Sequence, residues 1–584
     1  MSATQNTLNT NTIKSGTGTF PLNLVTFVLN SIITAYQDSL PSLIWILIRY
    51  YVLYLLIKFV IKSFFRGRWE KAMKKKWQAV AEKKRNQTRT RFKQVRNLID
   101  ALNDDNPKDL PEDLKKALPY ASVGQFHHYL LSGQLSCVQL LNFFFKRAVD
   151  IGLEHNLLTE PLYDFALSLA KKRDEELQVN LQAKKWTRIE QFPPLFGIPV
   201  TLKDQFQIKG ADTTLGVSAR AFTPEKETGL AARLIIEAGG VPFAKTNMPQ
   251  MFLAIETNNL IFGSSINPWN KERTTGGSSG GEAALAALGA SVLGFGSDSS
   301  GSCRIPTNFC GVYGMKPTSR RFTYKGISDP PFSDAMPDKA LSFGPISHNV
   351  ENLERGLKAF LNAELLRGEE FVKLGAKLSW DASRVYNIEN KQKLRIGVVT
   401  AFNEFGVTKT QARAIQEVSD KLKAVGHEIV DFNSTRAEFS NLVKGYLRVA
   451  TSGQGKPIDK VLQGEATIPE FSKGDPTENA PFWFKKYIAK ILESKGQKRL
   501  SELVLNMKNG SATENLGVLR KLIFEAREKI FKKYRDLKLD AMITPGIPVP
   551  AYRLGTQFIH ILRIFRFFTE KIFLHFFQFF INFL

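Results

Sequence analysis

The stretch TTGGSSGGEAALAALGASVLGFGSDSSGSCRIP, from Thr274 to Pro306, constrains the fold of this chain more than any other segment. It contains seven serines and no histidine. Segments rich in glycine and serine are usually flexible linkers, but here residues 282–296 are strongly apolar and begin as a good helix former. The stretch also lacks the GxxxxGK and strand-bounded GxGxxG patterns of phosphate-binding loops. The pattern therefore favours a packed site over a linker or a phosphate loop.

The remaining interpretation of this stretch is nucleophilic catalysis by a serine. A serine hydroxyl is a weak nucleophile until a base removes its proton. With no histidine nearby, a lysine could serve as the base if burial keeps its amine neutral. A second serine could pass the proton between them, and flanking glycines let backbone N–H groups converge on a developing oxyanion. We therefore expect two separated serines and a distant, buried lysine.

Several motifs of the chain resemble the amidase signature family. They are GIPVTLKDQF at 197–206, GGSSGG at 276–281, GSDSSGSCRIP at 296–306 and FCGVYGMKPT at 309–318. The resemblance implies an α/β amidase signature fold, with a mixed, twisted β-sheet core flanked by α-helices on both faces. It also implies a Ser–Ser–Lys triad that hydrolyses amide, and also ester, bonds through an acyl-enzyme.

Carried over residue by residue, the resemblance makes Ser302 the nucleophile and Ser278 the proton relay, in a cis-peptide context. Lys203 becomes the base. Lys203 precedes Ser278 by 75 residues and Ser278 precedes Ser302 by 24. Ser278 is also expected to contact substrate, whereas Ser279 is expected only to support the loop by hydrogen bonds.

The resemblance further implies an oxyanion hole made of backbone N–H groups. Asp298 and Arg304 fall where the family has structural polar partners. One departure concerns Ser300, which stands where the family usually has a second glycine, so its Cβ is expected to strain this turn. The expected oxyanion-hole residues are Ser299, Ser300, Gly301 and Ser302.

Residues 246–270, TNMPQMFLAIETNNLIFGSSINPWN, resemble the fatty-acid amide hydrolases within this family. The likeness extends over about residues 40 to 550 and is strongest from 195 to 320. It implies a lipid amide substrate of the N-acylethanolamine or primary fatty amide type. Phe252 and Leu253 match positions that line an acyl-chain channel, although ordinary core packing would explain them as well.

The N-terminal part of the chain carries a separate signal, an apolar run followed by a basic one. Residues 43–61 are mostly apolar and nearly long enough to cross a bilayer as a helix, although Arg49 would cost roughly 2.5–3.5 kcal/mol there. From Lys62 to Arg96 there are 14 Lys or Arg and two Glu, and the net charge of the chain is +25. We expect a transmembrane helix at 41–64 and a basic juxtamembrane helix at 65–108 that faces the cytosol. An interfacial or buried helix is the alternative.

Beyond these helices, the pattern predicts an amidase domain at 109–556. Helical periodicity dominates up to residue 182, and strands and helices then alternate, as in α/β domains. Strands are expected at 196–206, 241–247, 394–400 and 427–432, and helices at 227–240 and 410–426. The mixed aromatic and lysine segment at 480–491 suggests either a membrane-facing cap or a plain amphipathic surface helix.

Cofactor chemistry finds no support in the sequence. His127 and His128 are adjacent and have no nearby set of metal ligands, so we expect neither a metal nor a cofactor. The three cysteines, Cys137, Cys303 and Cys310, lack a disulfide-type spacing and suit a reducing, cytosolic setting.

Residues 1–40 are expected to be partly disordered, and residues 557–584 form a phenylalanine-rich tail that is atypical of the family. The preceding domain would then be truncated at its C-terminal end. This tail and Ser300 leave open a catalytically impaired, lipid-binding protein, and an amidase for smaller, non-lipid amides is a further alternative. No nucleic-acid motif is present, so the partners expected are a lipid amide and an endomembrane such as the endoplasmic reticulum, with a homodimer as a further option.

Overall fold

The computed structural model describes most of the chain between residues 42 and 555. The described residues are 42–104, 110–252, 254–318, 326–328, 341–361, 393–400, 407–433, 438–439, 442, 460–467, 482–494, 496, 501, 505, 516–547 and 549–555. Of residues 42–67, 102–104, 482–484 and 516–520 only the backbone is described. Leu253, residues 1–40 and the tail at 557–584 lie outside the described residues, so the expectations for them remain predictions.

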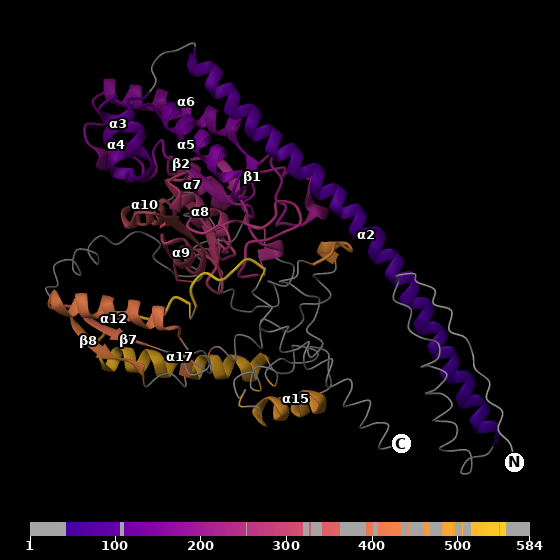
Figure 1. Cartoon of the computed structure of the whole chain (residues 1–584). Coiled ribbons are helices and arrows are strands. Elements are labelled where there is room, and N and C mark those ends of the chain that lie inside the picture. Colours follow the sequence, from indigo (N-terminus) through magenta and orange to yellow (C-terminus); the bar gives the residue numbers. More distant parts are fainter. Residues whose placement is uncertain are drawn as a thin grey trace. The chain divides into compact units, whose positions relative to one another are not determined.

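The chain divides into two compact units, one made of Met1–Lys71 with Ile561–Leu584 and the other of Ala72–His560. The helices of the described residues (Figure 1) are α2 (Ser42–Asp104), α3 (Glu112–Ala117), η1 (Leu118–Tyr120), α4 (Val123–Leu131), α5 (Cys137–Gly152), α6 (Tyr163–Gln182), η2 (Ile189–Gln191), η3 (Ser218–Arg220), α7 (Leu230–Glu237), η4 (Gln250–Phe252), α8 (Gly280–Ala287), α9 (Arg304–Cys310), α10 (Val350–Leu361), α12 (Lys409–Ala424), α15 (Phe482–Ser494) and α17 (Leu516–Asp536). The strands are β1 (Leu158–Pro161), β2 (Pro199–Lys203), β3 (Val241–Thr246), β4 (Leu293–Asp298), β5 (Tyr313–Gly314), β6 (Ser342–Ser347), β7 (Arg395–Val398), β8 (Glu428–Asp431) and β9 (Ala541–Ile543).

A six-stranded mixed sheet forms the centre of the second unit, in the order β1-β3-β2-β4-β6-β5. β2 runs parallel to β3 and β4, whereas β1, β5 and β6 pair with antiparallel neighbours. Helices α5 and α6 pack against β3, and α8 and α10 pack against β4 and β6. The predicted α/β class with a mixed sheet is therefore confirmed.

A second, three-stranded parallel sheet has the order β8-β7-β9. The predicted strands at 394–400 and 427–432 correspond to β7 and β8, and the predicted helix at 410–426 corresponds to α12. The sequence predicted one sheet, but the strands of the described residues form two separate ladders.

The apolar segment 282–296 does not form one helix, because it divides into the end of α8 and the start of β4. The division occurs at Gly289, which has a left-handed backbone with φ of 60°. A Cβ there would lie 2.7 Å from the ring of Pro119, so the tight turn between helix and strand requires glycine. This turn allows one short stretch to supply both a helix and a central strand.

The part of α2 that belongs to the second unit, residues 72–104, packs onto the rest of that unit along a stripe of buried side chains. Their spacing of three and four residues places them on one face of the helix. They are Trp77, Ala81, Lys84, Thr88, Phe92, Val95 and Ile99. Within the predicted basic helix at 65–108, residues 65–104 are helical, and part of this helix belongs to the hydrophobic core. Among the described residues, no helix is both long enough and apolar enough to span a bilayer.

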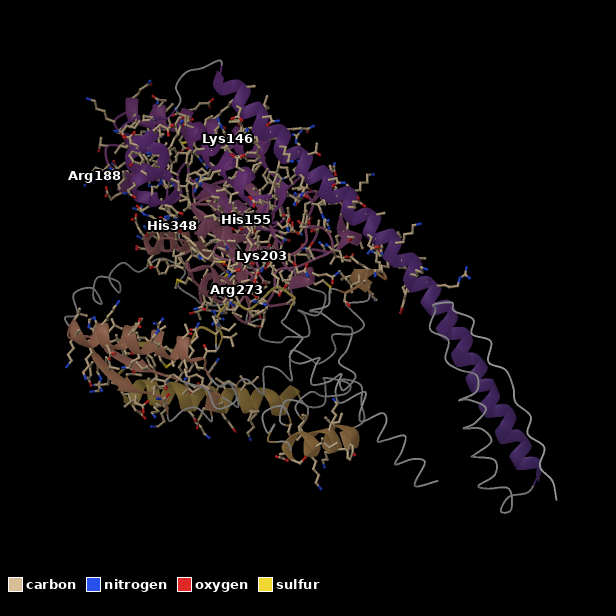
Figure 2. All side chains as sticks on the ribbon, viewed as in Figure 1. Lys146, His155, Arg188, Lys203, Arg273 and His348 are labelled. Atoms are coloured by element: carbon tan, nitrogen blue, oxygen red, sulfur yellow. The ribbon has the colours of Figure 1, made fainter. Side chains whose placement is uncertain are left out.

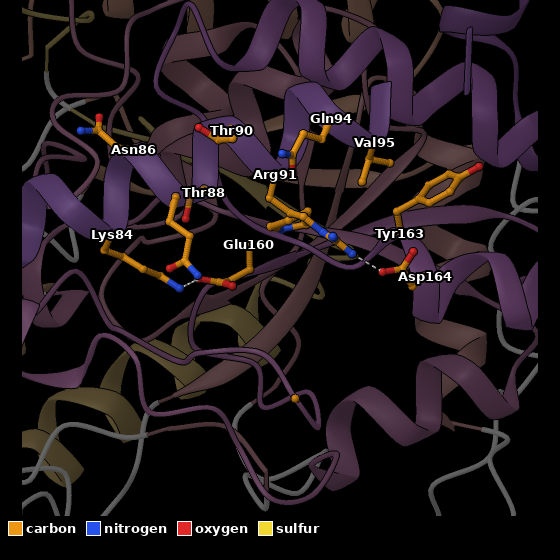
Figure 3. Close-up of a pocket in the computed structure, with 13 residues that line it drawn as sticks. Lys84, Asn86, Thr88, Thr90, Arg91, Gln94, Val95, Glu160, Tyr163 and Asp164 are labelled. Carbon is orange, nitrogen blue, oxygen red and sulfur yellow. Dashed lines mark hydrogen bonds and ion pairs between the residues drawn. The ribbon is translucent and has the colours of Figure 1, made fainter. Parts of the chain in front are cut away.

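This stripe includes a buried lysine, Lys84 (Figure 3). Lys84 Nζ lies 2.5 Å from a carboxylate oxygen of Glu160 and 2.7 Å from one of Asp212. Burial alone would lower the pKa of Lys84, but these two carboxylates outweigh it and raise the pKa. A buried ion pair of this kind costs stability when one partner is removed, so it fixes the register of α2 on the body of the protein.

We expect Phe92→Ala to lower the free energy of unfolding by about 3–5 kcal/mol, because it leaves a cavity in the core. Phe92 is fully buried, and its ring packs against that of Phe145 with centroids 5.8 Å apart. Leu98→Ala is the matched control, since Leu98 lies on the same helix but is 52% exposed. Chemical denaturation measures both, and equal midpoints for the two variants would contradict the packing of α2 on the core.

Candidate active site

The predicted base, Lys203, is the last residue of β2, at the centre of the six-stranded sheet (Figure 2). Its side chain is completely buried. Lys203 Nζ donates hydrogen bonds to Ser278 Oγ at 2.6 Å and to Ser297 Oγ at 3.0 Å. The structure therefore brings Lys203 and Ser278 into direct contact across 75 residues of sequence.

Ser278 lies in the turn that leads into α8, and its own side chain is almost fully buried. The peptide bond between Gly277 and Ser278 is cis, which agrees with the context that the resemblance implies. A Cβ at Gly277 would lie 2.9 Å from the carbonyl oxygen of Ile255. The backbone can pass this close because position 277 has no side chain.

The environment of Lys203 destabilises its charged form. Burial lowers its pKa from the ordinary value of 10.5 to about 8, and Cys303, Asp298 and Glu282 oppose this shift. Neutral amines accept protons, so a lysine with this pKa can act as a general base near physiological pH.

Ser302 lies between β4 and α9 and is half-buried. Its carbonyl oxygen accepts a hydrogen bond of 3.0 Å from the backbone N–H of Ser279, so the turn that carries Ser302 lies against the turn that carries Ser278. In the described part of the chain, Ser302 Oγ makes no hydrogen bond, and none joins it to Ser278 Oγ. Ser279 Oγ donates to the carbonyl of Ser297 at 3.3 Å, as expected of a supporting residue.

Asp298, the last residue of β4, organises the turn that contains Ser302. Its carboxylate accepts two hydrogen bonds of 2.9 Å from the Arg304 guanidinium. The backbone N–H groups of Gly301 and Cys303 donate to it at 2.7 and 3.1 Å. Burial would raise the pKa of Asp298, but these donors outweigh it and lower the pKa. The expected structural partnership of Asp298 and Arg304 is present.

The four expected oxyanion-hole residues follow Asp298 directly, but not all of their backbone N–H groups are free to bind a substrate oxygen. The N–H of Gly301 is occupied by Asp298, so it is not directed at a substrate oxygen in this arrangement. The expected backbone strain at Ser300 is wrong, since the left-handed residue of the turn is Gly301, with φ of 117°. Ser300 is exposed and is not among the described residues with positive φ, so its Cβ meets no special steric demand.

Phe252 is half-buried and ends η4, where Met251 and Phe252 both have left-handed backbones, with φ of 53° and 50°. Two consecutive non-glycine residues in this region are strained and persist only when their surroundings impose it. The segment that follows reaches Ile255, whose carbonyl contacts Gly277. Phe252 therefore lies three residues from a contact with the turn of Ser278.

The structure adds three polar residues that the sequence did not single out. Ser297 accepts a hydrogen bond from Lys203 and donates one to the side-chain carbonyl of Gln205. Glu282, in the first turn of α8, is fully buried against the same part of the sheet. Ser297 and Gln205 lie inside motifs that are recognisable in the sequence. Only the folded structure shows that hydrogen bonds connect them to Lys203.

Comparison with known proteins agrees with this site. The sequence pattern of the amidase family matches residues 139–565. Fatty-acid amide hydrolase 1 of Sus scrofa is 30% identical over 451 residues, which cover 75% of this chain and 70% of that protein. Amidase 1 of Gibberella moniliformis is 34% identical over 324 residues, covering 55% of this chain and 59% of that protein.

A solved structure of a fatty acid amide hydrolase superposes with a TM-score of 0.59 at 22% identity, covering 78% of this chain and 72% of the other. At that identity the superposition speaks for the fold alone. The family match spans most of the chain and contains every residue of the cluster around Lys203. The chain therefore belongs to the amidase signature family of amide hydrolases.

Proposed function

We propose that this protein hydrolyses fatty-acid amides through Ser302, Ser278 and Lys203. Neutral Lys203 takes the proton of Ser278 Oγ, which takes the proton of Ser302 Oγ as that oxygen attacks the amide carbonyl carbon. The proton then returns along the same path to the nitrogen of the leaving amine, whose bond to carbon breaks. Water attacks the resulting acyl-enzyme and releases the fatty acid.

The observation that carries this proposal is the completely buried hydrogen bond between Lys203 Nζ and Ser278 Oγ, 2.6 Å long. A surface lysine would be charged and hydrated and could not take up a proton at neutral pH. The contact between the turns of Ser278 and Ser302 supports the second transfer. Catalytic contacts often tighten on substrate binding, so we expect the hydrogen bond between the two hydroxyls to form in the complex with substrate.

The fatty-acid part of the proposal rests on two supports. One is the likeness to a protein named fatty-acid amide hydrolase 1. The other is the apolar run at 43–61 with its basic successor, which would hold the enzyme at a membrane, where long-chain amides partition. We propose that α15 and the basic part of α2 face this surface from the cytosolic side.

A second candidate is an amidase for small, non-lipid amides. It is favoured by the likeness to proteins named amidase and acetamidase. Both candidates share the chemistry of the site and differ only in what surrounds the acyl group.

Chain length of the acyl group separates the two candidates. We expect kcat/KM for a long-chain primary amide to exceed that for acetamide by at least about 100-fold, because each buried methylene contributes roughly 0.8 kcal/mol. Phe252→Ala should lower the long-chain value by about tenfold and leave the value for acetamide unchanged. Purified full-length protein in detergent, assayed by mass spectrometry of the released acid, measures both. Equal rates for the two substrates would favour the small-amide candidate.

A further inference from the structure

Glu282 is a fully buried carboxylic acid that the mechanism above does not use. It lies in the first turn of α8, four residues after Ser278. Burial raises its pKa from the ordinary value of 4.5 to about 7. A buried carboxylate charge costs free energy unless hydrogen-bond donors stabilise it. The donors that contact Glu282 therefore indicate its role.

The two oxygens of Glu282 bind the strands on either side of it. Thr246 Oγ1 of β3 donates to Oε1 at 2.7 Å, and Thr201 Oγ1 of β2 donates to Oε2. Ser291 Oγ lies 2.8 Å from Thr201 Oγ1. Thr201 donates its single hydroxyl proton to Glu282, so Ser291 is the donor in the hydrogen bond between Ser291 and Thr201. Two hydroxyls therefore donate to the carboxyl and a third donates to one of these two, an arrangement that suits an ionised acid.

These same threonines border Lys203 in the sheet. Thr246 is the register partner of Lys203 across the β2–β3 ladder. Thr201 is two residues before Lys203 on β2, so both side chains leave the same face of the sheet. Its register partner on β4 is Gly294, where a Cβ would come within 1.9 Å of Glu282 Oε2. The carboxyl of Glu282 therefore occupies the space above Gly294, which has no side chain, on the face of the sheet that carries Lys203.

We propose that Glu282 is a positioning residue that clamps α8 to β2 and β3, holding Ser278 against Lys203, and that its buried negative charge controls how readily Lys203 gives up its proton. This inference rests on the Ser–Ser–Lys assignment proposed above. Glu282 connects the helix that begins behind Ser278 with the strand that ends at Lys203, so one side chain sets both the geometry and the electrostatics of the proton path.

The other charged and titratable groups near Lys203 leave this role to Glu282. Asp298 of β4 is ionised and also stabilises the charged form of Lys203, but its carboxylate is held in a bidentate pair with Arg304. Cys303 remains a thiol, because burial raises its pKa far above the ordinary value. Lys245 precedes Thr246 on β3, so it points to the opposite face, where it meets Asp204 and the backbone of Asp212. Glu282 is thus the buried acid near Lys203 that titrates near neutral pH without a basic side chain of its own.

Glu282→Gln removes the charge but keeps the shape of the side chain and a hydrogen-bonding oxygen. We expect the acidic limb of the kcat/KM profile to move to lower pH by on the order of one unit, with the plateau at high pH nearly unchanged. Glu282→Ala should instead lower kcat at every pH, because α8 loses its clamp. A kcat that is near wild type in Glu282→Gln but low in Glu282→Ala would separate the positioning role of Glu282 from the effect of its charge.

Glu465→Gln is the matched control. Glu465 is also fully buried, with a pKa raised by burial to about 7, but its partners are Ser218 and Gln250. The same substitution there should leave the limb in place. If Glu282→Gln fails to fold, Thr246→Val and Thr246→Ser replace it. Loss of the hydroxyl disfavours the ionised acid, so we expect the valine variant to shift the limb in the same direction, and the serine variant not to shift it.

The inference would be overturned if the acidic limb of the kcat/KM profile stayed in place in Glu282→Gln while Ser302→Ala is inactive. Where Thr246→Val replaces Glu282→Gln, the same result in Thr246→Val would overturn it. If Ser302→Ala were active, the catalytic assignment itself would fall. Full-length protein with a long-chain amide substrate serves for all these profiles, and a limb that moves in Glu465→Gln as much as in Glu282→Gln would also count against a specific role of Glu282.

Discussion

Ser302→Ala is expected to abolish amide hydrolysis, with kcat falling by at least about 10⁴-fold. The reason is that Ser302 is the proposed nucleophile, so that without its hydroxyl no acyl-enzyme is expected to form. The variant should also lose covalent labelling by a fluorophosphonate probe. Because Ser302 is half-buried and its hydroxyl makes no hydrogen bond among the described residues, its removal should leave the unfolding midpoint nearly unchanged.

Ser347→Ala provides the comparison for this experiment. Ser347 is a buried serine of β6 that donates to the carbonyl of Val292 at 2.7 Å. Its loss should cost about 1 kcal/mol of stability while activity and labelling persist. Wild-type-like turnover in Ser302→Ala would remove Ser302 from the mechanism, whatever the result for Ser347.

Lys203→Met is expected to lower kcat/KM by about 10²–10⁴-fold, the usual contribution of a general base. In the wild type the pKa of Lys203 is lowered by burial to about 8, and only the neutral amine accepts a proton. Activity should therefore rise as pH increases through 8 and fall about tenfold per unit below it. The residual rate of Lys203→Met should lack this rise, because the titrating group is gone.

Lys245→Met is the control for removing a buried lysine. Lys245 is equally buried on the neighbouring strand, but its Nζ binds the carbonyl of Asp212 and the hydroxyl of Thr213. This variant should be less stable, yet the protein that folds should keep the rise through pH 8. A Lys203→Met enzyme with an unchanged pH profile would show that another group titrates.

Much of the site could be predicted from sequence because the decisive signals are local. The motifs around Lys203, Ser278 and Ser302 each occupy about ten residues, and their residue types meet strict demands of the chemistry. The bond between Lys203 and Ser278 and the pair of Asp298 with Arg304 were both expected, and the structure contains them. The strand that carries Lys203 was also predicted, since buried strands read as short apolar runs, whereas β4, which carries Asp298, was not.

Other features could not be predicted, because they depend on contacts between distant segments. Strand β1 lies in a region that reads as helical, and it forms because β3 pairs with it. The buried stripe of α2 was hidden by the basic residues around it, and Lys84 reads as one more surface charge until Glu160 and Asp212 enclose it. The strain expected at Ser300 falls on Gly301 instead, since only the folded turn decides which residue takes the left-handed conformation.

The sequence by itself determined the family, the order of the catalytic motifs and the choice of a lysine in place of a histidine, because each of these is written in residue types close together in the chain. Only the tertiary structure decided that Lys203 is completely buried, which lowers its pKa to about 8, and that Glu282 binds the threonines that border Lys203 in the sheet. Burial and electrostatic coupling depend on contacts between distant segments, and Glu282 reaches Thr201 and Thr246 only when the sheet and α8 have packed together.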